Sequence, residues 1–290
     1  MLKHIIEGTD MKGVIIAAGY GTRFLPATKT IPKEMFPLID TPAISFIIDE
    51  FIDAGITDIL IITSRRKKSL EDYLDREVEL ETVFSNEGKT EKLNKIQTKN
   101  ANVYFARQQR MRGTGDALLL CESFAAGDAV CIAYPDDIVF ADTPLTKQLM
   151  DVMPDTNHSV LAVMEVPAEE THRYGIVSVS DDMKVGSIIE KPPQGTAPSN
   201  LAIIGRYILS PEVYPMLKEE REKNPTGEFY QIDPMNKLAA SGKVSACSFS
   251  GKRLDVGEPM GYIKAILEYG LTRAELKQPI LDFMKELLHT

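Results

Sequence analysis

Residues 14–37 read VIIAAGYGTRFLPATKTIPKEMFP, and this stretch decides the fold of the chain. It opens with the apolar run 14–17 and then turns into the glycine-rich segment 19–23. An apolar run that meets glycines is typical of a buried parallel strand whose chain enters a tight loop. We therefore predict an α/β fold in which this strand lies in a parallel sheet and the loop follows its carboxyl end.

The loop combines backbone donors with fixed positive charge. Gly19 and Gly21 permit a positive φ and let backbone N–H groups approach a ligand closely. Arg23, Lys29 and Lys33 add cationic side chains within a few residues. Two glycines alone are explained equally well by an ordinary strand-to-loop turn. Together with the cations, they indicate a binding site for a polyphosphate.

Two better-known phosphate loops do not match. The dinucleotide fingerprint G-x-G-x-x-G requires a third glycine where Phe24 stands, which excludes a Rossmann dehydrogenase. Gly88, Lys89 and Thr90 supply the end of a Walker motif, but Val83 occupies the position of its first glycine. The polyphosphate site therefore belongs to another class of loop.

The composition limits the classes of function. The chain has 290 residues, of which 43% are hydrophobic and 26% charged, as is ordinary for a globular protein with a large core. Its 33 basic and 42 acidic residues give a net charge of −9, which argues against a nucleic-acid-binding surface. Cys121, Cys131 and Cys247 lack metal-ligand spacing, and their odd number favours a reducing cytoplasm.

No membrane segment is expected. No apolar run approaches the roughly 20 residues of a membrane span, and no signal peptide is visible. Residues 1–10 precede Met11 and are expected to be an N-terminal extension.

Strands and helices alternate through the first half of the chain. Apolar runs predict strands at 14–17, 59–62, 103–106 and 130–133, and helical spacing predicts helices at 43–54, 67–74 and 117–124, with a polar helical excursion over 77–100. This alternation indicates a mostly parallel sheet with right-handed crossovers. Ligands of such sheets bind beyond the carboxyl ends of the strands, where both the glycine loop and Asp136 fall.

The second half has a different pattern. It predicts strands at 159–166, 175–179, 187–190, 201–209 and 244–249, and helices at 211–218, 231–240, 261–268 and 276–288. The run 201–209 is expected to return to the sheet.

Two aspartates follow apolar segments more than a hundred residues apart. Asp136 comes after a strand and a proline, and Asp255 repeats that arrangement. Two carboxylates together with phosphate oxygens form a hard oxygen site that suits Mg²⁺. A single aspartate at such a place is more often a turn former or a helix cap.

These motifs together resemble a known family. Gly19-x-Gly21-Thr22-Arg23, followed by Pro-Lys-Glu at 32–34, resembles the signature of the sugar-phosphate nucleotidyltransferases. The string 28–37 most resembles bacterial UTP–glucose-1-phosphate uridylyltransferases, and the resemblance continues to about residue 269. It implies a single Rossmann-like nucleotidyltransferase domain over 11–270, with a mixed, mostly parallel sheet. A nucleotide-binding half at 11–150, a sugar-binding half at 151–257 and a C-terminal helix at 271–290 are expected.

The resemblance also implies a role for each residue that matches the family motifs. The nucleotide-binding residues would be Ala17, Ala18, Gly19, Gly21, Thr22, Arg23, Gln108, Gly113 and Asp136. The sugar phosphate would be bound by Gly175, Glu190, Lys191, Asn200 and Gly205. Arg23, Lys33 and Lys191 would be catalytic, and Asp136 and Asp255 would hold Mg²⁺. Asp137 is expected to support this site or to form the turn.

The chain departs from the family pattern at three positions. Thr114 and Asp116 stand where the commonest uridylyltransferase pattern, G-L-G-H-A, carries Leu and His. Asp116 is also explained by a place in the first turn of the following helix. Tyr230 stands where relatives often carry Gln. Thr114 and Asp116 leave the choice between UTP and dTTP open, and the loop of Tyr230 is expected to affect sugar-site closure or subunit contact.

The expected reaction is transfer of a uridylyl group from UTP to α-D-glucose 1-phosphate with release of pyrophosphate. The attacking phosphate has a second pKa of about 6, so it needs no general base. This agrees with the positions of His4, His158, His172 and His289, which lie outside the motifs. A cytoplasmic homo-oligomer, either a dimer or a tetramer, is expected by resemblance.

Three alternatives stay open. The chain could be a glucose-1-phosphate thymidylyltransferase, or it could act on N-acetylglucosamine 1-phosphate. It could also be a catalytically silent regulatory subunit, which the presence of Arg23, Lys33, Asp136, Lys191 and Asp255 disfavours.

Overall fold

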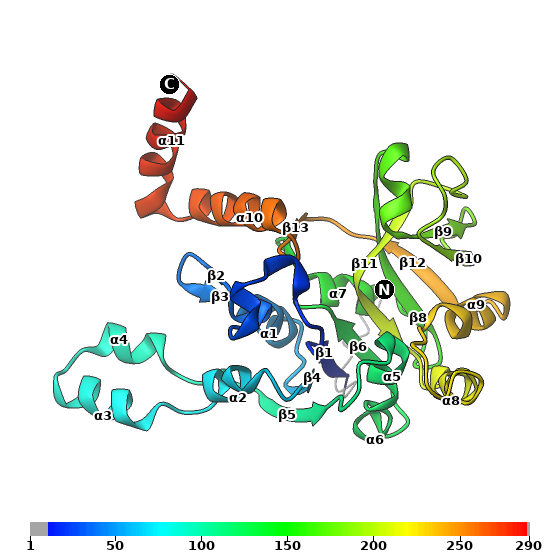
Figure 1. Ribbon diagram of the computed structural model, residues 1–290, viewed down its shortest axis with the longest axis horizontal. Helices are drawn as coiled ribbons and strands as arrows, with labels where there is room; N and C mark the ends of the chain where they lie inside the picture. Colours follow the sequence, from blue (N-terminus) through cyan, green and yellow to red (C-terminus); the bar gives the residue numbers. More distant parts are fainter. Residues whose placement is uncertain (1–10, 289–290) are drawn as a thin grey trace, which may run out of the picture.

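A nine-stranded mixed sheet runs through the chain, whose computed structural model describes residues 11–288 (Figure 1). Its parallel part has the order β6-β1-β4-β5. These strands are β1 Lys12–Ile16, β4 Asp58–Thr63, β5 Asn102–Arg107 and β6 Val130–Ala133. Val14 lies opposite Leu60 on one side and Ile132 on the other. The apolar runs of β1, β4 and β6 form strands that are buried on both faces, whereas β5 lies at the edge of the sheet and is largely exposed.

The second half of the chain joins the same sheet through β11 Leu201–Leu209. This strand pairs antiparallel with β6 on one side and with β8 Ser159–Glu165 on the other. β12 Val244–Ser248 extends the sheet beyond β8. The hairpin of β9 Gly175–Val179 and β10 Val185–Glu190 pairs with the start of β11. The strand expected to return to the sheet is therefore the one that unites its two parts.

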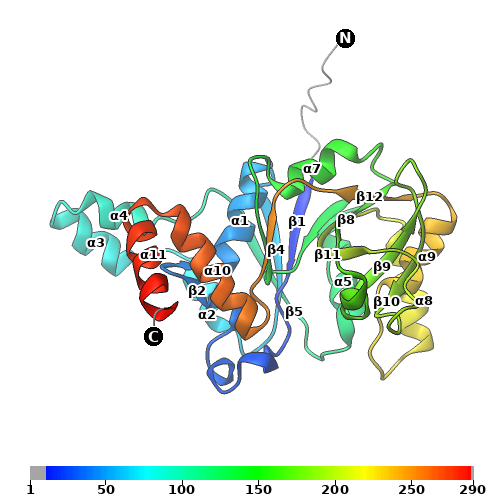
Figure 2. The same cartoon turned by 90° about the horizontal axis from the view of Figure 1, so that it is seen from above.

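Helices cover both faces of the sheet, as seen edge-on in Figure 2. One face packs against α1 Ala43–Asp53, α7 Leu145–Val152 and α10 Pro259–Thr272. The other packs against α5 Gly113–Leu119, α6 Glu122–Ala125, α8 Val213–Lys223 and α9 Ile232–Ala240. Ile15 belongs to the first core and Val14 to the second, because successive strand residues point to opposite faces.

Two small sheets and four 3₁₀ turns complete the central body. β7 Asp137–Phe140 pairs with β13 Lys252–Asp255, and β2 Pro37–Leu38 pairs with β3 Thr41–Pro42. The turns are η1 Thr22–Phe24, η2 Ala27–Lys29, η3 Lys33–Met35 and η4 Ala168–Arg173. The sequence predicted neither β7 nor α7. The pairing of β7 with β13 matters most, because it places Asp255 opposite Asp137.

Three helices extend from this body: α3 Val78–Asn86, α4 Thr90–Lys95 and α11 Ala274–Leu288 (Figure 1). α2 Lys68–Leu74 instead packs on the core through Leu70, which is fully buried. The helical excursion expected over 77–100 is thus confirmed by α3 and α4. No helix within residues 11–288 is long and apolar enough to cross a membrane. The extension expected at 1–10 lies outside the described residues, and the proposed division into two halves stays a prediction.

Candidate active site

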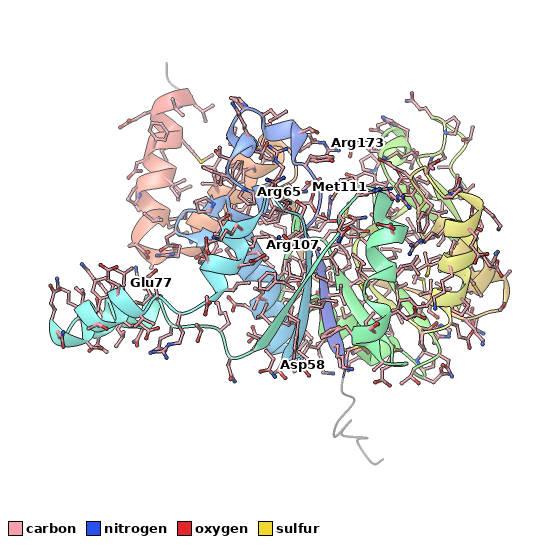
Figure 3. The ribbon with its side chains drawn as sticks, turned by 60° about the horizontal axis from the view of Figure 1, so that its bottom comes forward. Asp58, Arg65, Glu77, Arg107, Met111 and Arg173 are labelled. Atoms are coloured by element: carbon pink, nitrogen blue, oxygen red, sulfur yellow. The ribbon has the colours of Figure 1, made fainter. Side chains whose placement is uncertain are left out.

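The glycine loop leaves β1 at the carboxyl edge of the parallel strands. Figure 3 shows Asp58, the first residue of β4, at one end of the sheet, and Arg65, just past the end of β4, at the other. Gly21 has a φ of +67°, which a residue with a Cβ rarely adopts. The Thr28 hydroxyl donates to the Gly21 carbonyl at 2.8 Å and so holds the turn. Thr22 and Arg23, at the start of η1, are exposed to solvent beyond this turn.

Lys33 connects the loop to the strand end of β6. Its Nζ forms an ion pair with Asp136 Oδ2. Burial lowers the pKa of Lys33, but attraction to Asp136 and Glu34 outweighs it, so the pKa is raised. Burial likewise raises the pKa of Asp136, and Lys33 overcomes that effect and lowers it. Both groups are therefore charged at neutral pH.

A second ion pair lies behind the first. Lys67 Nζ donates to Glu34 Oε1 at 2.6 Å, and both side chains are buried. The sequence placed Lys67 in an exposed helix, and this was wrong for Lys67, which precedes α2 and is 5% exposed. A small pocket next to this pair is lined by Gly19, Lys33, Arg66 and Lys67, among others. Three cations thus meet one backbone turn.

Carboxylates from two distant segments converge beside this loop. Gly257 lies between them: a Cβ built on Gly257 would be 2.7 Å from Asp136 Oδ2 and 3.1 Å from Asp255 Oδ1. The two carboxylate oxygens are therefore no farther apart than the sum of these distances. Asp137 lines the same cleft, but its carboxylate is already paired: it accepts from Arg253 Nε at 2.6 Å and from the Gly205 amide at 2.7 Å.

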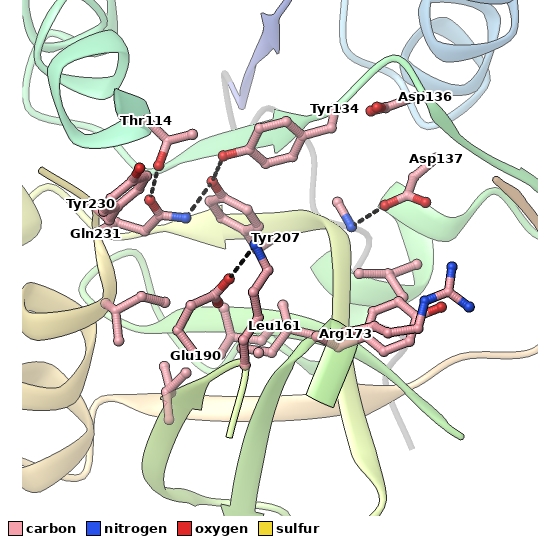
Figure 4. Close-up of a pocket in the computed structure, with 18 of the residues that line it drawn as sticks. Thr114, Tyr134, Asp136, Asp137, Leu161, Arg173, Glu190, Tyr207, Tyr230 and Gln231 are labelled. Atoms are coloured by element: carbon pink, nitrogen blue, oxygen red, sulfur yellow. Dashed lines mark hydrogen bonds and ion pairs between the residues drawn. The ribbon is translucent and has the colours of Figure 1, made fainter. Parts of the chain in front are cut away.

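A cleft of about 800 Å³ opens beside the carboxylates (Figure 4). It is lined by residues from both halves of the chain, including seven of the predicted ones: Arg23, Asp136, Gly175, Glu190, Lys191, Gly205 and Asp255. The loop, the two aspartates and the β9–β10 hairpin therefore face one shared volume.

The far end of the cleft is formed by the β9–β10 hairpin. Gly175 pairs with Glu190 across the two strands, and a Cβ at Gly175 would lie 3.0 Å from Glu190 Oε2. Lys191 has a φ of 45°, and its amide donates to the Tyr174 carbonyl at 2.9 Å. Its Nζ lies 3.7 Å from Glu190 Oε1. A carboxylate and an ammonium group are thus presented side by side.

In the segment 108–116, which is expected to recognise the base, the residues hydrogen-bond to one another. Gln108 Nε2 donates to the Gly113 carbonyl at 3.1 Å and to Asp116 Oδ2 at 3.0 Å. Both amide hydrogens are thereby engaged, and the Gln108 Oε1 acceptor is left for a ligand. Asp116 lies in the first turn of α5, as expected. Gly113 makes room for the backbone of Phe229, since a Cβ there would lie 2.3 Å from the Phe229 carbonyl oxygen.

A family model described as nucleotidyl transferase matches residues 12–270. The chain belongs to this family. A UTP–glucose-1-phosphate uridylyltransferase of Staphylococcus epidermidis is 44% identical over 95% of this chain and 98% of its own length. Another, from Bacillus subtilis, is 44% identical over 96% of this chain and 97% of its own.

Solved structures agree with this family. The UTP-bound UGPase from Acinetobacter baumannii matches with a TM-score of 0.86 and 33% identity, over 96% of this chain and 99% of that one. A UDP-glucose pyrophosphorylase complexed with UDP-glucose matches with a TM-score of 0.79 and 35% identity, over 91% of this chain and 99% of that one. The predicted fold class, a nucleotidyltransferase domain on a mixed sheet, is confirmed.

Nine of the residues expected in this nucleotidyltransferase site do not line the large cleft: Ala17, Ala18, Gly19, Gly21, Thr22, Lys33, Gln108, Gly113 and Asn200. Ala17 and Ala18 are buried directly after β1, so only their backbone groups could reach a ligand. Asn200 precedes β11, and its carbonyl accepts from the Val166 amide at 2.9 Å. The roles assigned to these nine residues stay predictions, as do the roles of the seven residues that line the cleft.

Sequence reasoning gave no role to several residues that build the site. Arg253 holds Asp137, and Lys67 holds Glu34. Tyr134 also lines the cleft, with its hydroxyl 3.1 Å from that of Tyr207. The run Arg253-Leu-Asp255 carried the only signal, since alternating charges around a leucine indicate a strand with one polar face.

Proposed function

We propose that the chain is a UTP–glucose-1-phosphate uridylyltransferase, which makes UDP-glucose and pyrophosphate from UTP and α-D-glucose 1-phosphate. One observation supports this most strongly: a single cleft brings together Arg23, the two aspartates and the Glu190–Lys191 pair. Cations and carboxylates in that order suit two phosphate-bearing substrates and the hydroxyls of a sugar. The names and the high coverage of the relatives support the same reaction.

The two aspartates fit a magnesium ion. Their oxygens approach one common point at Gly257, and Mg²⁺ in nucleotide sites is held by one or two carboxylates with phosphate oxygens and waters. Within residues 11–288, no three His, Cys, Asp or Glu residues are grouped to hold a metal on their own. We propose that Asp136 and Asp255 hold Mg²⁺, which when bound neutralises developing charge on the phosphates.

The mechanism rests on positioning two anions. Lys191 would bind the phosphate of the incoming sugar ester, while Glu190 accepts hydrogen bonds from its hydroxyls. Arg23 and the backbone of the glycine loop would bind the triphosphate, with Lys33 and the cations of the small pocket. The acceptor phosphate is largely dianionic at neutral pH, so the residues supply orientation and charge rather than a general base.

The decisive experiment measures pyrophosphate release from UTP, glucose 1-phosphate and Mg²⁺. We expect turnover by the wild type, and a loss of roughly 10²–10³ in kcat/KM for Lys191→Ala or Asp136→Ala. Lys184→Ala is the matched control, because Lys184 is an exposed lysine at the opposite end of the same hairpin and pairs with Asp182. Activity of Lys191→Ala within threefold of the wild type would refute its role.

Gln108 is the residue that we expect to contact the base of the nucleotide. Gln108 Oε1 can accept from the N3–H group, which uracil and thymine share. A panel of UTP and dTTP, each with glucose 1-phosphate and N-acetylglucosamine 1-phosphate, distinguishes the alternatives. We expect the highest kcat/KM for UTP with glucose 1-phosphate.

Oligomeric state and location complete the proposal. We expect a homo-oligomer, either a dimer or a tetramer, and sedimentation velocity would measure it. We also expect the protein in the cytoplasm, in line with three cysteines that are all free thiols.

A further inference from the structure

Four polar side chains on one side of the cleft form a hydrogen-bonded network, called here the polar wall: Thr114, Tyr134, Tyr207 and Gln231 (Figure 4). The Thr114 hydroxyl contacts Gln231 Oε1. Gln231 Nε2 donates to the Tyr207 hydroxyl at 3.4 Å, and the two tyrosine hydroxyls are 3.1 Å apart. The residues come from α5, the end of β6, β11 and the residue before α9, so only tertiary folding assembles the wall.

The surroundings of the polar wall are apolar. Leu161, Ile188 and Met235 line the same cleft and are 3%, 4% and 2% exposed. Polar groups in such surroundings cost free energy unless they are paired, whereas apolar side chains would fill the space at no such cost. A polar ligand that hydrogen-bonds to the polar wall would explain why these positions carry polar side chains.

The polar wall has more hydrogen-bonding capacity than it uses internally. Its hydroxyls each donate one bond and accept two, and the Gln231 amide donates two and accepts two. Both tyrosine hydroxyls keep their hydrogen at neutral pH, because the ordinary pKa of a phenol is about 10. The internal bonds leave donors and acceptors available to the cleft.

The position of the wall identifies the part of the substrate that it meets. Glu190 ends β10, and α9, which begins directly after Gln231, is fixed to that strand by two hydrogen bonds between the Asn236 side chain and the backbone of Ile188. Asp136, where the phosphates are placed, lies on the far side of Tyr134 from Thr114 and Gln231 (Figure 4). A sugar whose hydroxyls are bound by Glu190 would therefore turn its remaining hydroxyls toward the polar wall.

We propose that Gln231, held in place by Thr114 and Tyr207, is a specificity-determining residue that binds a sugar hydroxyl not bound by Glu190. The proposal rests on the proposed function, because it names a determinant of the same sugar site. It gives Thr114, one of the departures from the family pattern, a physical role: it orients the Gln231 amide by engaging its oxygen.

The test combines side-chain substitutions in the enzyme with deoxy analogues of the sugar, each of which lacks one hydroxyl. The substrates are glucose 1-phosphate and its 2-, 3-, 4- and 6-deoxy analogues, each measured for kcat/KM at saturating UTP. We expect the wild type to disfavour the analogue that lacks the Gln231-bound hydroxyl by roughly 10–100-fold. In Gln231→Leu this preference should fall to about threefold or less, while the preference at the hydroxyls bound by Glu190 persists.

Reciprocal variants serve as controls. Glu190→Gln should weaken discrimination at a different hydroxyl and leave that of Gln231 in place. Thr114→Val removes the orienting hydroxyl at nearly constant shape and should weaken the Gln231-dependent preference, whereas Thr114→Ser should retain it. A thermal unfolding curve for each variant shows whether the variant folds. If Gln231→Leu does not fold, Thr114→Val still tests the proposal.

Three outcomes would overturn the inference. In the first, Gln231→Leu lowers kcat/KM by the same factor for all five sugars. In the second, it changes none of them. In the third, Gln231→Leu raises the KM for UTP, which would show that the polar wall contacts the nucleotide. A wild type without turnover of UTP and glucose 1-phosphate would instead refute the proposed function, so the two failures are distinguishable.

Discussion

At the scale of single residues, glycines serve two separable purposes in this chain. Gly113 and Gly195 both have a positive φ, of 86° and 80°. A Cβ on Gly195 would meet no atom within 4 Å, whereas a Cβ on Gly113 would overlap the Phe229 carbonyl oxygen. Gly195 therefore satisfies the backbone alone, while Gly113 also permits the close packing of the 227–231 loop against α5.

This difference gives a first prediction. Gly195→Ala is expected to lower the free energy of unfolding by about 1–2 kcal/mol, the cost of a left-handed conformation. Gly113→Ala is expected to cost about 1–3 kcal/mol more, because the backbone of Phe229 must move. Urea denaturation measures both, and equal costs would show that the Phe229 contact does not constrain Gly113.

A second prediction concerns His158, whose side chain is buried and whose Nε2 lies 2.8 Å from the Ser245 hydroxyl. Burial, aided by Lys184 and opposed by Asp155, lowers the pKa of His158 in the folded state. The unfolded chain, with a histidine pKa of about 6.5, then binds the proton more readily. Protonation therefore favours unfolding, and stability falls as the pH drops below that value.

The measurement is urea unfolding at pH 7 and pH 5. His158→Gln should lose a smaller part of its stability over this interval than the wild type does. His172→Gln, at an exposed histidine, is the control. An identical loss in His158→Gln and the wild type would contradict the assignment.

At the scale of elements, one buried ion pair joins the two halves of the fold. Arg206 on β11 contacts Glu50 on α1 in a bidentate pair, with Nε–Oε1 and Nη2–Oε2 distances of 2.9 and 2.8 Å. Glu50 Oε1 also accepts from the backbone amide and the hydroxyl of Thr146 at the start of α7. Arg206 is fully buried, so its charge depends on this partner.

Glu50→Ala is therefore expected to lower the free energy of unfolding by about 3–5 kcal/mol, because it leaves an uncompensated guanidinium in the core. Glu212→Ala is the matched control. Glu212 pairs with Lys243, but the two side chains are 35% and 41% exposed, respectively. That variant should cost no more than about 1 kcal/mol. Similar costs for the two would refute the structural role of the buried pair.

At the scale of the whole molecule, the proposed site lies between segments that are far apart in the sequence. The glycine loop, β7, the β9–β10 hairpin and β13 all contribute to the cleft. A ligand that contacts all of them can bind only the folded chain. Its binding should therefore stabilise the fold as a whole.

We expect UTP with Mg²⁺ to raise the midpoint temperature of thermal unfolding. At a ligand concentration of a hundred times Kd, the free energy of unfolding should increase by about 2.7 kcal/mol. Removing Mg²⁺ with EDTA should reduce the shift, because Asp136 and Asp255 then face the phosphates without a counter-ion. In Asp136→Ala the dependence on Mg²⁺ should largely disappear. Equal shifts with and without Mg²⁺ in the wild type would contradict the proposed metal site.

The sequence by itself determined the local features of this protein. The apolar runs specified β1, β4 and β6, because burial on both faces requires it, and the glycine turn followed because Gly21 needs a positive φ. The signature around Arg23 and Lys33 was sufficient to identify the family. Periodicity and turn chemistry act over a few residues and can be read directly.

Only the tertiary structure decided which charges and polar groups meet. Lys33 pairs with Asp136, Lys67 is buried against Glu34, and the β7–β13 pairing places Asp255 opposite Asp137. Gln231 meets Thr114 across more than a hundred residues. No local pattern encodes such contacts, because their free energy comes from desolvation and pairing between segments that touch only after the sheet has formed.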